Sequence, residues 1–303
     1  MRLLGLDFAD LTAAAAARAI AARPTGAGFS YVVTPNADHL VRLARDPALA
    51  ALYQHAWLRL LDSRVVAGLA GLCGLRAPAV SPGSDLTALL LRRHIEPGER
   101  IAIVGMRPAW VPLLEARCGL APCVHHDPPM GFDRDPAAMA RAVSFVLAHP
   151  ARFVFFAVGS PRQEFLAAAV AATGQAVGTG LCVGASLAFL AGVERRAPVW
   201  MQRHRLEWAF RLANDPRRLA RRYLLDSPQV VPMLLRERLG ARPSVNRTWS
   251  NFRSGCIGTT PSLATAWLDA TGSENAPGEE GVEVCQRPEP QAHGTAPSRH
   301  GPT

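Results

Sequence analysis

The stretch from Arg152 to Glu164, RFVFFAVGSPRQE, joins an apolar run to a polar turn of the kind that binds ligands. The apolar run predicts a strand that is buried on both faces, as in a parallel sheet. A glycine turn follows it, and an alanine-rich helix is expected from Arg162 to about Ala172. Ligands of open α/β sheets bind beyond the carboxyl ends of the strands, and a helix N-terminus favours negative charge. We therefore predict that Gly159, Gln163 and Glu164 contact a phosphate-bearing substrate; an ordinary turn with a solvated Gln163 is the alternative.

Polar or glycine residues end other apolar runs in the same way. Thr34 and Asn36 follow the run FSYVV, and Gly105 ends the run ERIAIVG. If both runs are strands of one parallel sheet, their carboxyl ends meet at one edge, and these residues are candidates for substrate binding.

Two aspartates, Asp62 and Asp85, also lie next to apolar runs. Asp62 follows a leucine pair, and a turn aspartate without function is the alternative for it. Ser84 and Asp85 lie in the loop SPGSD ahead of a leucine-rich helix over residues 86–93. Both are candidates for substrate binding, and helix N-capping alone is the alternative for them.

The order of the expected strands and helices predicts the fold that positions these candidate residues. Strands alternate with helices over about 190 residues, which predicts a doubly wound, mostly parallel, Rossmann-like α/β sheet. The strands are expected near residues 29–34, 99–105, 121–124, 153–158 and 175–183. The first residues are a poor signal peptide and favour a strand followed by a helix capped near Asp10 or Thr12. We assign residues 1–194 to this core.

After residue 194 the chain becomes rich in arginine. All 33 basic residues are arginines, the net charge is +9, and residues 195–222 hold nine arginines against two acids. Interleaved aromatic and leucine residues predict amphipathic basic helices over residues 195–240, with a break at Pro216. A solvated helical cap, a membrane-surface element, an anion clamp and a site for single-stranded nucleic acid all fit this pattern. Residues 241–303 lose periodicity and predict a disordered tail.

Cysteine and histidine spacing predicts no metal site. None of the six cysteines forms a CxxC pair, and His125 and His126 are adjacent, so on extended chain they point to opposite faces. Free thiols suit a reducing cytoplasm, and no apolar segment approaches the 18 or so residues that a membrane span needs.

Several of these motifs, taken together, resemble the WecG/TagA/CpsF glycosyltransferases, glycosyltransferase family 26. The resemblance covers roughly residues 5–228. It rests on TPN at 34–36, Asp62, GSD at 83–85, GSPRQE at 159–164 and the block RAPVWMQRHRLEWAFRLANDPRRLARRY at 196–223. The last two motifs, in this order and spacing, are specific to the family.

The resemblance implies an inverting, metal-independent transfer in bacterial surface-polysaccharide synthesis. A sugar moves from a UDP-sugar to a saccharide linked to polyprenyl diphosphate, at the inner face of the cell membrane. The protein is then cytoplasmic and peripheral, with no cofactor and no nucleic acid as a partner, and a homo-oligomer is compatible with this. N-acetylmannosamine, its uronic acid and glucose remain open as the donor sugar.

The resemblance also implies roles for individual residues. Asp62 matches the general base, Thr34 and Asn36 match residues of the sugar pocket, and Gln163 matches a glutamine that binds the donor. Four arginines match those that hold diphosphates at the membrane: Arg211, Arg218, Arg221 and Arg222.

The sequence departs from the family at a few positions. Ser63 stands where the family usually has glycine, Val80-Ser81-Pro82 replaces an Arg-Val pair, and Ala188 stands where an aspartate is common. Two other functions stay open: an inactive relative that acts as an assembly partner, and a basic nucleic-acid-binding α/β protein. A dehydrogenase would need a G-x-G-x-x-G turn after its first strand, which Thr34-Pro35-Asn36 is not.

Overall fold

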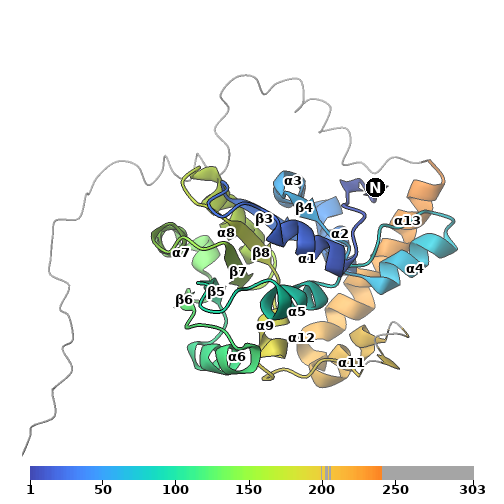
Figure 1. Ribbon diagram of the computed structural model, residues 1–303. Helices are drawn as coiled ribbons and strands as arrows, with labels where there is room; N and C mark the ends of the chain where they lie inside the picture. Colours follow the sequence, from blue (N-terminus) through green and yellow to red (C-terminus); the bar gives the residue numbers. More distant parts are fainter. Residues whose placement is uncertain (199, 202–203, 205, 241–303) are drawn as a thin grey trace, which may run out of the picture.

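The computed structural model describes residues 1–198, 200–201, 204 and 206–240. Within these residues a six-stranded sheet forms the centre of the molecule, in the order β4-β3-β8-β7-β5-β6 (Figure 1). All five pairings between neighbouring strands are parallel. The strands are β3 (Ser30–Val33), β4 (Leu58–Arg59), β5 (Ala102–Gly105), β6 (Val124–His126), β7 (Phe153–Ala157) and β8 (Thr179–Cys182). The predicted α/β class with a mostly parallel sheet is confirmed.

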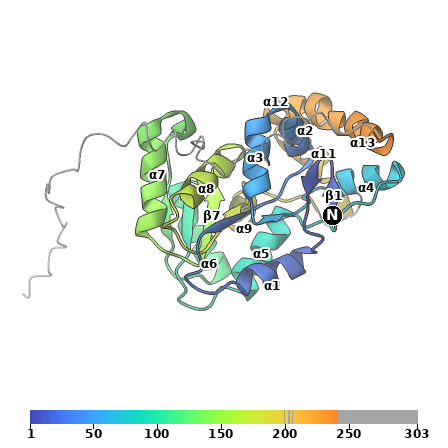
Figure 2. The same cartoon turned by 90° about the horizontal axis from the view of Figure 1, so that it is seen from above.

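Helices cover both faces of the sheet, and Figure 2 shows α1 and α5 on one side and α3, α7 and α8 on the other. The first set includes α1 (Ala13–Ala21), α5 (Gly83–Arg93), α6 (Val111–Cys118) and α9 (Ser186–Leu190). The second set includes α2 (Ala37–Arg45), α3 (Pro47–His55), α4 (Arg64–Leu72), α7 (Pro136–Ala148) and α8 (Arg162–Ala172). Strand β7 joins both layers, because Phe153 and Phe155 pack in one core and Val154 and Phe156 in the other. This double burial explains its uninterrupted apolar sequence.

Some local predictions differ from the structure. The expected N-terminal strand is a separate antiparallel ribbon of β1 (Arg2–Leu3) and β2 (Leu6–Asp7), although Thr12 caps α1 as expected. Helix α5 begins at Gly83 after Pro82 and has no side-chain cap from its own segment, so N-capping by Ser84 or Asp85 is wrong. Strand β4 was not predicted, since a two-residue edge strand carries almost no periodicity.

The basic C-terminal region is helical where the structure describes it. It contains α11 (Glu207–Asn214), α12 (Pro216–Arg221), a π-helical turn η3 (Arg222–Asp226), η4 (Ser227–Gln229) and α13 (Val230–Arg238). Pro216 begins α12, as expected from the break in the pattern. Two short 3₁₀ turns complete the described elements: η1 (Pro108–Trp110) and η2 (Phe132–Arg134). The predicted tail, residues 241–303, lies outside the described residues.

Contacts with the sheet layers fix these helices in place. Val230 and Leu234 of α13 are buried in the core that includes α2 and α4. Asp38 of α2 holds Arg222 at 3.3 Å, and Asp85 of α5 holds Arg196 at 2.6 Å. The basic region is therefore anchored at both ends, beside the carboxyl ends of the strands.

Gly105 allows the end of β5 to pack closely against the end of β7, because it has no side chain. A substitution at this position tests that role. Its φ is +92°, and a Cβ there would lie 2.6 Å from Val158 Cγ1 and 2.8 Å from the Ala157 carbonyl carbon. Replacement by alanine adds this overlap to the cost of a left-handed residue, so Gly105→Ala should lower the free energy of unfolding by about 2 to 5 kcal/mol. Gly98 is the matched control, because its φ is +82° and nothing lies within 4 Å of its Cβ position.

Chemical denaturation of both variants checks this expectation. Gly98→Ala should cost only about 1 to 2 kcal/mol. Equal losses in the two variants would contradict the close-packing role of Gly105.

Candidate functional site

A cavity of about 770 Å³ lies at the carboxyl ends of β3, β7 and β8, under α11 and α12. The turns after the strands form its floor, and the basic helices form its roof. It brings together eight of the residues selected from the sequence: Thr34, Asn36, Asp62, Ser84, Gly159, Gln163, Arg211 and Arg222. These residues come from segments up to 188 positions apart in the chain, so their convergence is a property of the fold.

Other selected residues lie beside this cavity and not in its described lining. Asp85 pairs with Arg196 at 2.6 Å and with Arg64 at 3.7 Å, so it anchors the basic region. Arg221 has a side chain that is 86% exposed and lies 3.9 Å from Asp226. Gly105 has the packing role given above, and the side chain of Arg218 lies outside the described residues.

Glu164 lies behind the cavity wall and orients Gln163. It is buried, accepts a hydrogen bond from Tyr53 Oη at 2.8 Å, and accepts another from Gln163 Nε2 at 3.0 Å. Gln163 Oε1 in turn accepts from the Gly184 N–H at 3.0 Å. Burial, followed by the charge of Glu164, raises the pKa of Tyr53 well above its usual value. The amide of Gln163 is therefore fixed at the start of α8, ready to bind a ligand in the cavity.

Asp62 is held at the N-terminus of α5. Its N–H donates to the Pro35 carbonyl at 3.0 Å, and its Oδ2 accepts from the Gly83 N–H at 3.2 Å. A carboxylate from outside α5 thus satisfies a free N–H group of its first turn and lies at the positive end of its dipole. Gly83 is required here, since a Cβ would lie 2.9 Å from Thr34 Oγ1. This explains the GSD motif: its glycine positions the carboxylate and its aspartate anchors Arg196.

Burial raises the pKa of Asp62 to about 6. The Gly83 hydrogen bond and the charges of Arg211 and Arg196 oppose this increase, while Glu207 adds to it. A carboxyl group of this pKa is mostly ionised at pH 7 and is a stronger base than an ordinary aspartate. Asp62 can therefore accept a proton at neutral pH.

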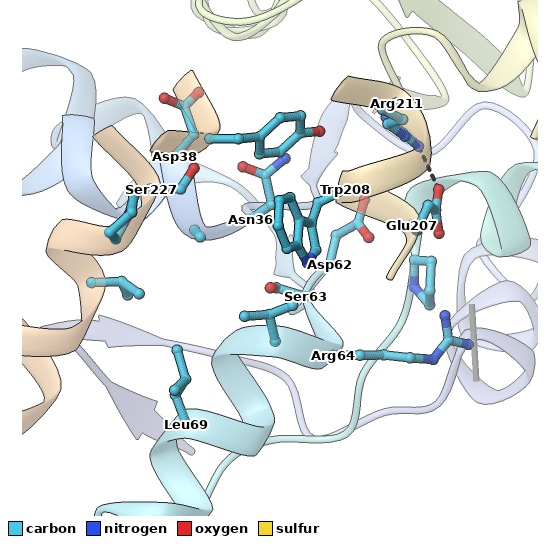
Figure 3. Close-up of a pocket in the computed structure, with 16 residues that line it drawn as sticks. Asn36, Asp38, Asp62, Ser63, Arg64, Leu69, Glu207, Trp208, Arg211 and Ser227 are labelled. Atoms are coloured by element: carbon cyan, nitrogen blue, oxygen red, sulfur yellow. Dashed lines mark hydrogen bonds and ion pairs between the residues drawn. The ribbon is translucent and has the colours of Figure 1, made fainter. Parts of the chain in front are cut away.

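A second cavity, of about 370 Å³, is also lined by Asp62 (Figure 3). Asn36, Asp62, Arg211 and Tyr223 line both cavities. Residues of α2, α4, α11, η4 and the start of α13, with the N-cap residues of α4 and α5, complete the smaller one: Ala37, Asp38, Ser63, Arg64, Val65, Leu69, Pro82, Glu207, Trp208, Ser227, Pro228 and Val230. The carboxylate of Asp62 thus borders two spaces at once, which suits a base that acts between two substrates.

Sequence reasoning missed Glu207, Trp208 and Tyr223 as functional candidates. The sequence did point to two of them, because Glu207 and Trp208 belong to the LEW segment (residues 206–208) of the block at 196–223 that resembles the family. In that motif, roles were predicted only for arginines.

Two arginines that border the larger cavity, Arg211 and Arg222, are paired with acids. Arg211 Nη2 lies 2.7 Å from Glu207 Oε1, and its guanidinium stacks on Phe189 at 5.1 Å. Arg222 contacts Asp38 at 3.3 Å and donates to Asn36 Oδ1 at 3.3 Å. These contacts hold Arg211 at the border of both cavities and Arg222 at the border of the larger one.

Within the described residues, no group of three or more His, Cys, Asp or Glu side chains could hold a metal ion. The paired histidines point apart: His125 Nε2 lies 3.0 Å from the Gly105 carbonyl oxygen, and His126 stacks on Phe145 at 5.3 Å. None of the described helices combines the length and the apolar character that a bilayer crossing requires.

Comparison with known proteins gives two matches. The model of the "Glycosyl transferase WecG/TagA/CpsF family" matches residues 1–244. A protein of Bacillus spizizenii (strain ATCC 23059 / NRRL B-14472 / W23) is 28% identical over 221 residues, which is 71% of this chain and 82% of the relative. That relative is an N-acetylglucosaminyldiphosphoundecaprenol N-acetyl-beta-D-mannosaminyltransferase.

The raised pKa of Asp62 predicts that this residue destabilises the fold at neutral pH. Because the folded state binds the proton more tightly than the unfolded state, stability linked to Asp62 is present below pH 3.8 and is lost as the pH rises through 6. Asp62→Asn removes this loss and keeps an oxygen for the Gly83 N–H. It should increase the free energy of unfolding at pH 7 by about 1 to 3 kcal/mol.

Denaturation at pH 7 and pH 5 measures this, with the exposed Asp127→Asn as the control. The advantage of Asp62→Asn should shrink at pH 5, and Asp127→Asn should have little effect at either pH. A less stable Asp62→Asn protein at pH 7 would show that the carboxylate is not desolvated.

Proposed function

The chain belongs to the WecG/TagA/CpsF family of glycosyltransferases, and we propose that it transfers a sugar from a UDP-sugar to a sugar linked to polyprenyl diphosphate, with inversion. The observation that supports this proposal best is the position of Asp62. A desolvated carboxylate with a pKa of about 6 borders two cavities, and both are large enough to hold a sugar.

The larger cavity suits the UDP-sugar. It lies beyond the strand ends, where nucleotides bind in doubly wound sheets, and the N-terminus of α8 opens into it. Thr34, Asn36 and the fixed amide of Gln163 offer hydrogen bonds to a sugar. Arg211 and Arg222 offer guanidinium groups to a diphosphate.

The reaction then follows from these positions. Asp62 removes the proton of an acceptor hydroxyl as that oxygen forms a bond to the anomeric carbon of the donor. The bond from this carbon to the diphosphate oxygen breaks on the opposite face, and UDP takes the electron pair and leaves as an anion. Since UDP needs no proton, the site requires one base and no acid. The arginines supply the charge stabilisation that a metal supplies in other transferases, so we propose a metal-independent reaction.

Ser63 is compatible with this activity, although the family usually has glycine there. Its Oγ accepts the Val66 N–H at 3.1 Å and so caps α4, and the residue lines the smaller cavity without displacing Asp62. The departure therefore has a local structural role.

The acceptor places the reaction at a membrane. We propose that this chain uses a polyprenyl-diphosphate-linked N-acetylglucosamine, as the name of the Bacillus relative states for that protein. Helices α4 and α13 lie side by side (Figure 1), and both present leucines to solvent near the smaller cavity. The most exposed are Leu72 at 84%, Leu235 at 48% and Leu239 at 82%. Arg236 and Arg238 of α13 are also exposed, which suits an anionic membrane surface.

A donor screen tests the proposed reaction. The protein should release UDP and form a lipid-linked product from one UDP-sugar, only when a short polyprenyl-diphosphate-linked N-acetylglucosamine is present. N-acetylmannosamine is the first donor to test, then its uronic acid and glucose. EDTA should not change the rate. Transfer that EDTA abolishes would contradict metal independence, and UDP release that ignores the acceptor would contradict the proposed reaction.

Vesicle flotation tests the membrane surface. The protein should float with phosphatidylglycerol vesicles and not with phosphatidylcholine vesicles, and salt should weaken the binding. Leu235→Glu should reduce flotation, whereas Leu113→Glu on α6, where the leucine is 44% exposed, is the matched control. Equal losses in the two variants would contradict docking through α13.

A further inference from the structure

The smaller cavity combines aromatic and acidic side chains. The rings of Trp208 and Tyr223 lie with centroids 6.2 Å apart, and both line the cavity. Three carboxylates also line it, those of Asp38, Asp62 and Glu207 (Figure 3). Aromatic faces pack on the apolar face of a sugar ring, and carboxylates accept hydrogen bonds from its hydroxyl groups.

Its arginines are already engaged by acids. Arg211 is held by Glu207 at 2.7 Å, and Arg64 lies 3.7 Å from Asp85. Asp38 is likewise paired, with Arg42 at 3.0 Å and with Arg222 at 3.3 Å. The charges of the lining are therefore largely balanced, which favours a neutral polyol such as a sugar ring. The volume of about 370 Å³ is near the lower end for ligand pockets, which suits one sugar ring and not a nucleotide-sugar.

We propose that the smaller cavity is the specificity site for the acceptor sugar, with Trp208 stacking on the ring and Glu207 binding a hydroxyl group. This inference rests on the proposed transfer reaction and adds two residues and a location to it.

Glu207 has the geometry for this task. Its Oε1 holds Arg211, and no described residue donates a hydrogen bond to its Oε2. The side chain lines the smaller cavity and not the larger one, so it reaches the acceptor without contacting the donor.

Trp208 completes the orientation of the ring. It is 38% exposed and follows Glu207 on α11, and Asp62 lines the same cavity. A ring stacked on Trp208 with one hydroxyl on Glu207 presents another hydroxyl to Asp62. That hydroxyl then faces the larger cavity through the shared border of Asn36, Arg211 and Tyr223.

Kinetic measurements on Glu207→Gln and Trp208→Ala test the assignment in the full chain. The KM for the lipid-linked acceptor should rise about fivefold or more in Glu207→Gln, which loses a charge-assisted hydrogen bond, and about tenfold or more in Trp208→Ala. The KM for the UDP-sugar should stay within about twofold in Trp208→Ala, because Trp208 does not line the larger cavity. Glu207→Gln also loosens Arg211, so the donor KM of Trp208→Ala is the one that distinguishes the two sites.

Two matched controls separate this effect from general damage. Glu96→Gln changes an exposed carboxylate far from the site, and Trp57→Ala removes a tryptophan that is also 38% exposed. Both should leave the acceptor KM unchanged. An increase in the donor KM of Trp208→Ala instead, or an acceptor KM that rises no more than in the controls, would overturn the assignment.

A binding measurement decides the question without turnover. Calorimetric titration uses two probes, UDP and N-acetylglucosaminyl diphosphate with a short alkyl chain. Trp208→Ala should bind UDP as wild type does and bind the alkyl-linked probe at least about tenfold more weakly. Equal affinity of wild type and both variants for that probe would overturn the acceptor site. Normal probe binding without turnover by the wild type would instead count against the proposed reaction.

Discussion

The hydrogen bond from the Gly83 N–H to the carboxylate of Asp62 is the contact on which the site depends. It places the carboxylate at the end of α5, where the dipole and a free N–H stabilise its charge against the cost of burial. Burial raises the pKa of this group and makes it a stronger base, while the N–H at the helix end lowers the pKa. The balance between these effects yields a pKa of about 6, which is near the pH at which a base is most effective.

The basic C-terminal helices contribute residues to both cavities. They cover the strand ends, and two arginines of the larger cavity have acidic partners: Glu207 for Arg211 and Asp38 for Arg222. Such pairing fixes long side chains before a ligand arrives, so less side-chain entropy is lost on binding. The same α11 that carries Arg211 to the larger cavity carries Glu207 and Trp208 to the smaller one. One short helix thus faces both substrates across Asp62.

Local patterns predicted much of this molecule. The apolar run before Gly159, the helix after it and the residues Thr34 and Asn36 followed from strand and turn signals, and the α/β class followed from their alternation. The roles of the acidic residues did not follow, because they depend on contacts between distant segments. Asp62 meets Gly83 across 21 residues, Asp85 meets Arg196 across 111, and Tyr53 meets Glu164 across 111. Glu164 is an example. It follows Gln163 in the sequence, but its carboxylate is buried and accepts hydrogen bonds from Tyr53 and from Gln163, which it orients.

The pH dependence of kcat/KM for transfer tests the central claim most directly. If Asp62 is the base, the rate should fall on the acid side with an apparent pKa near 6, so that the value at pH 5 is about one tenth of the plateau. Asp62→Asn should lose most of the rate and this acid limb together while it keeps its affinity for UDP. An Asp62→Asn protein that retains the rate and the same acid limb would contradict the account, because another group would then be accepting the proton.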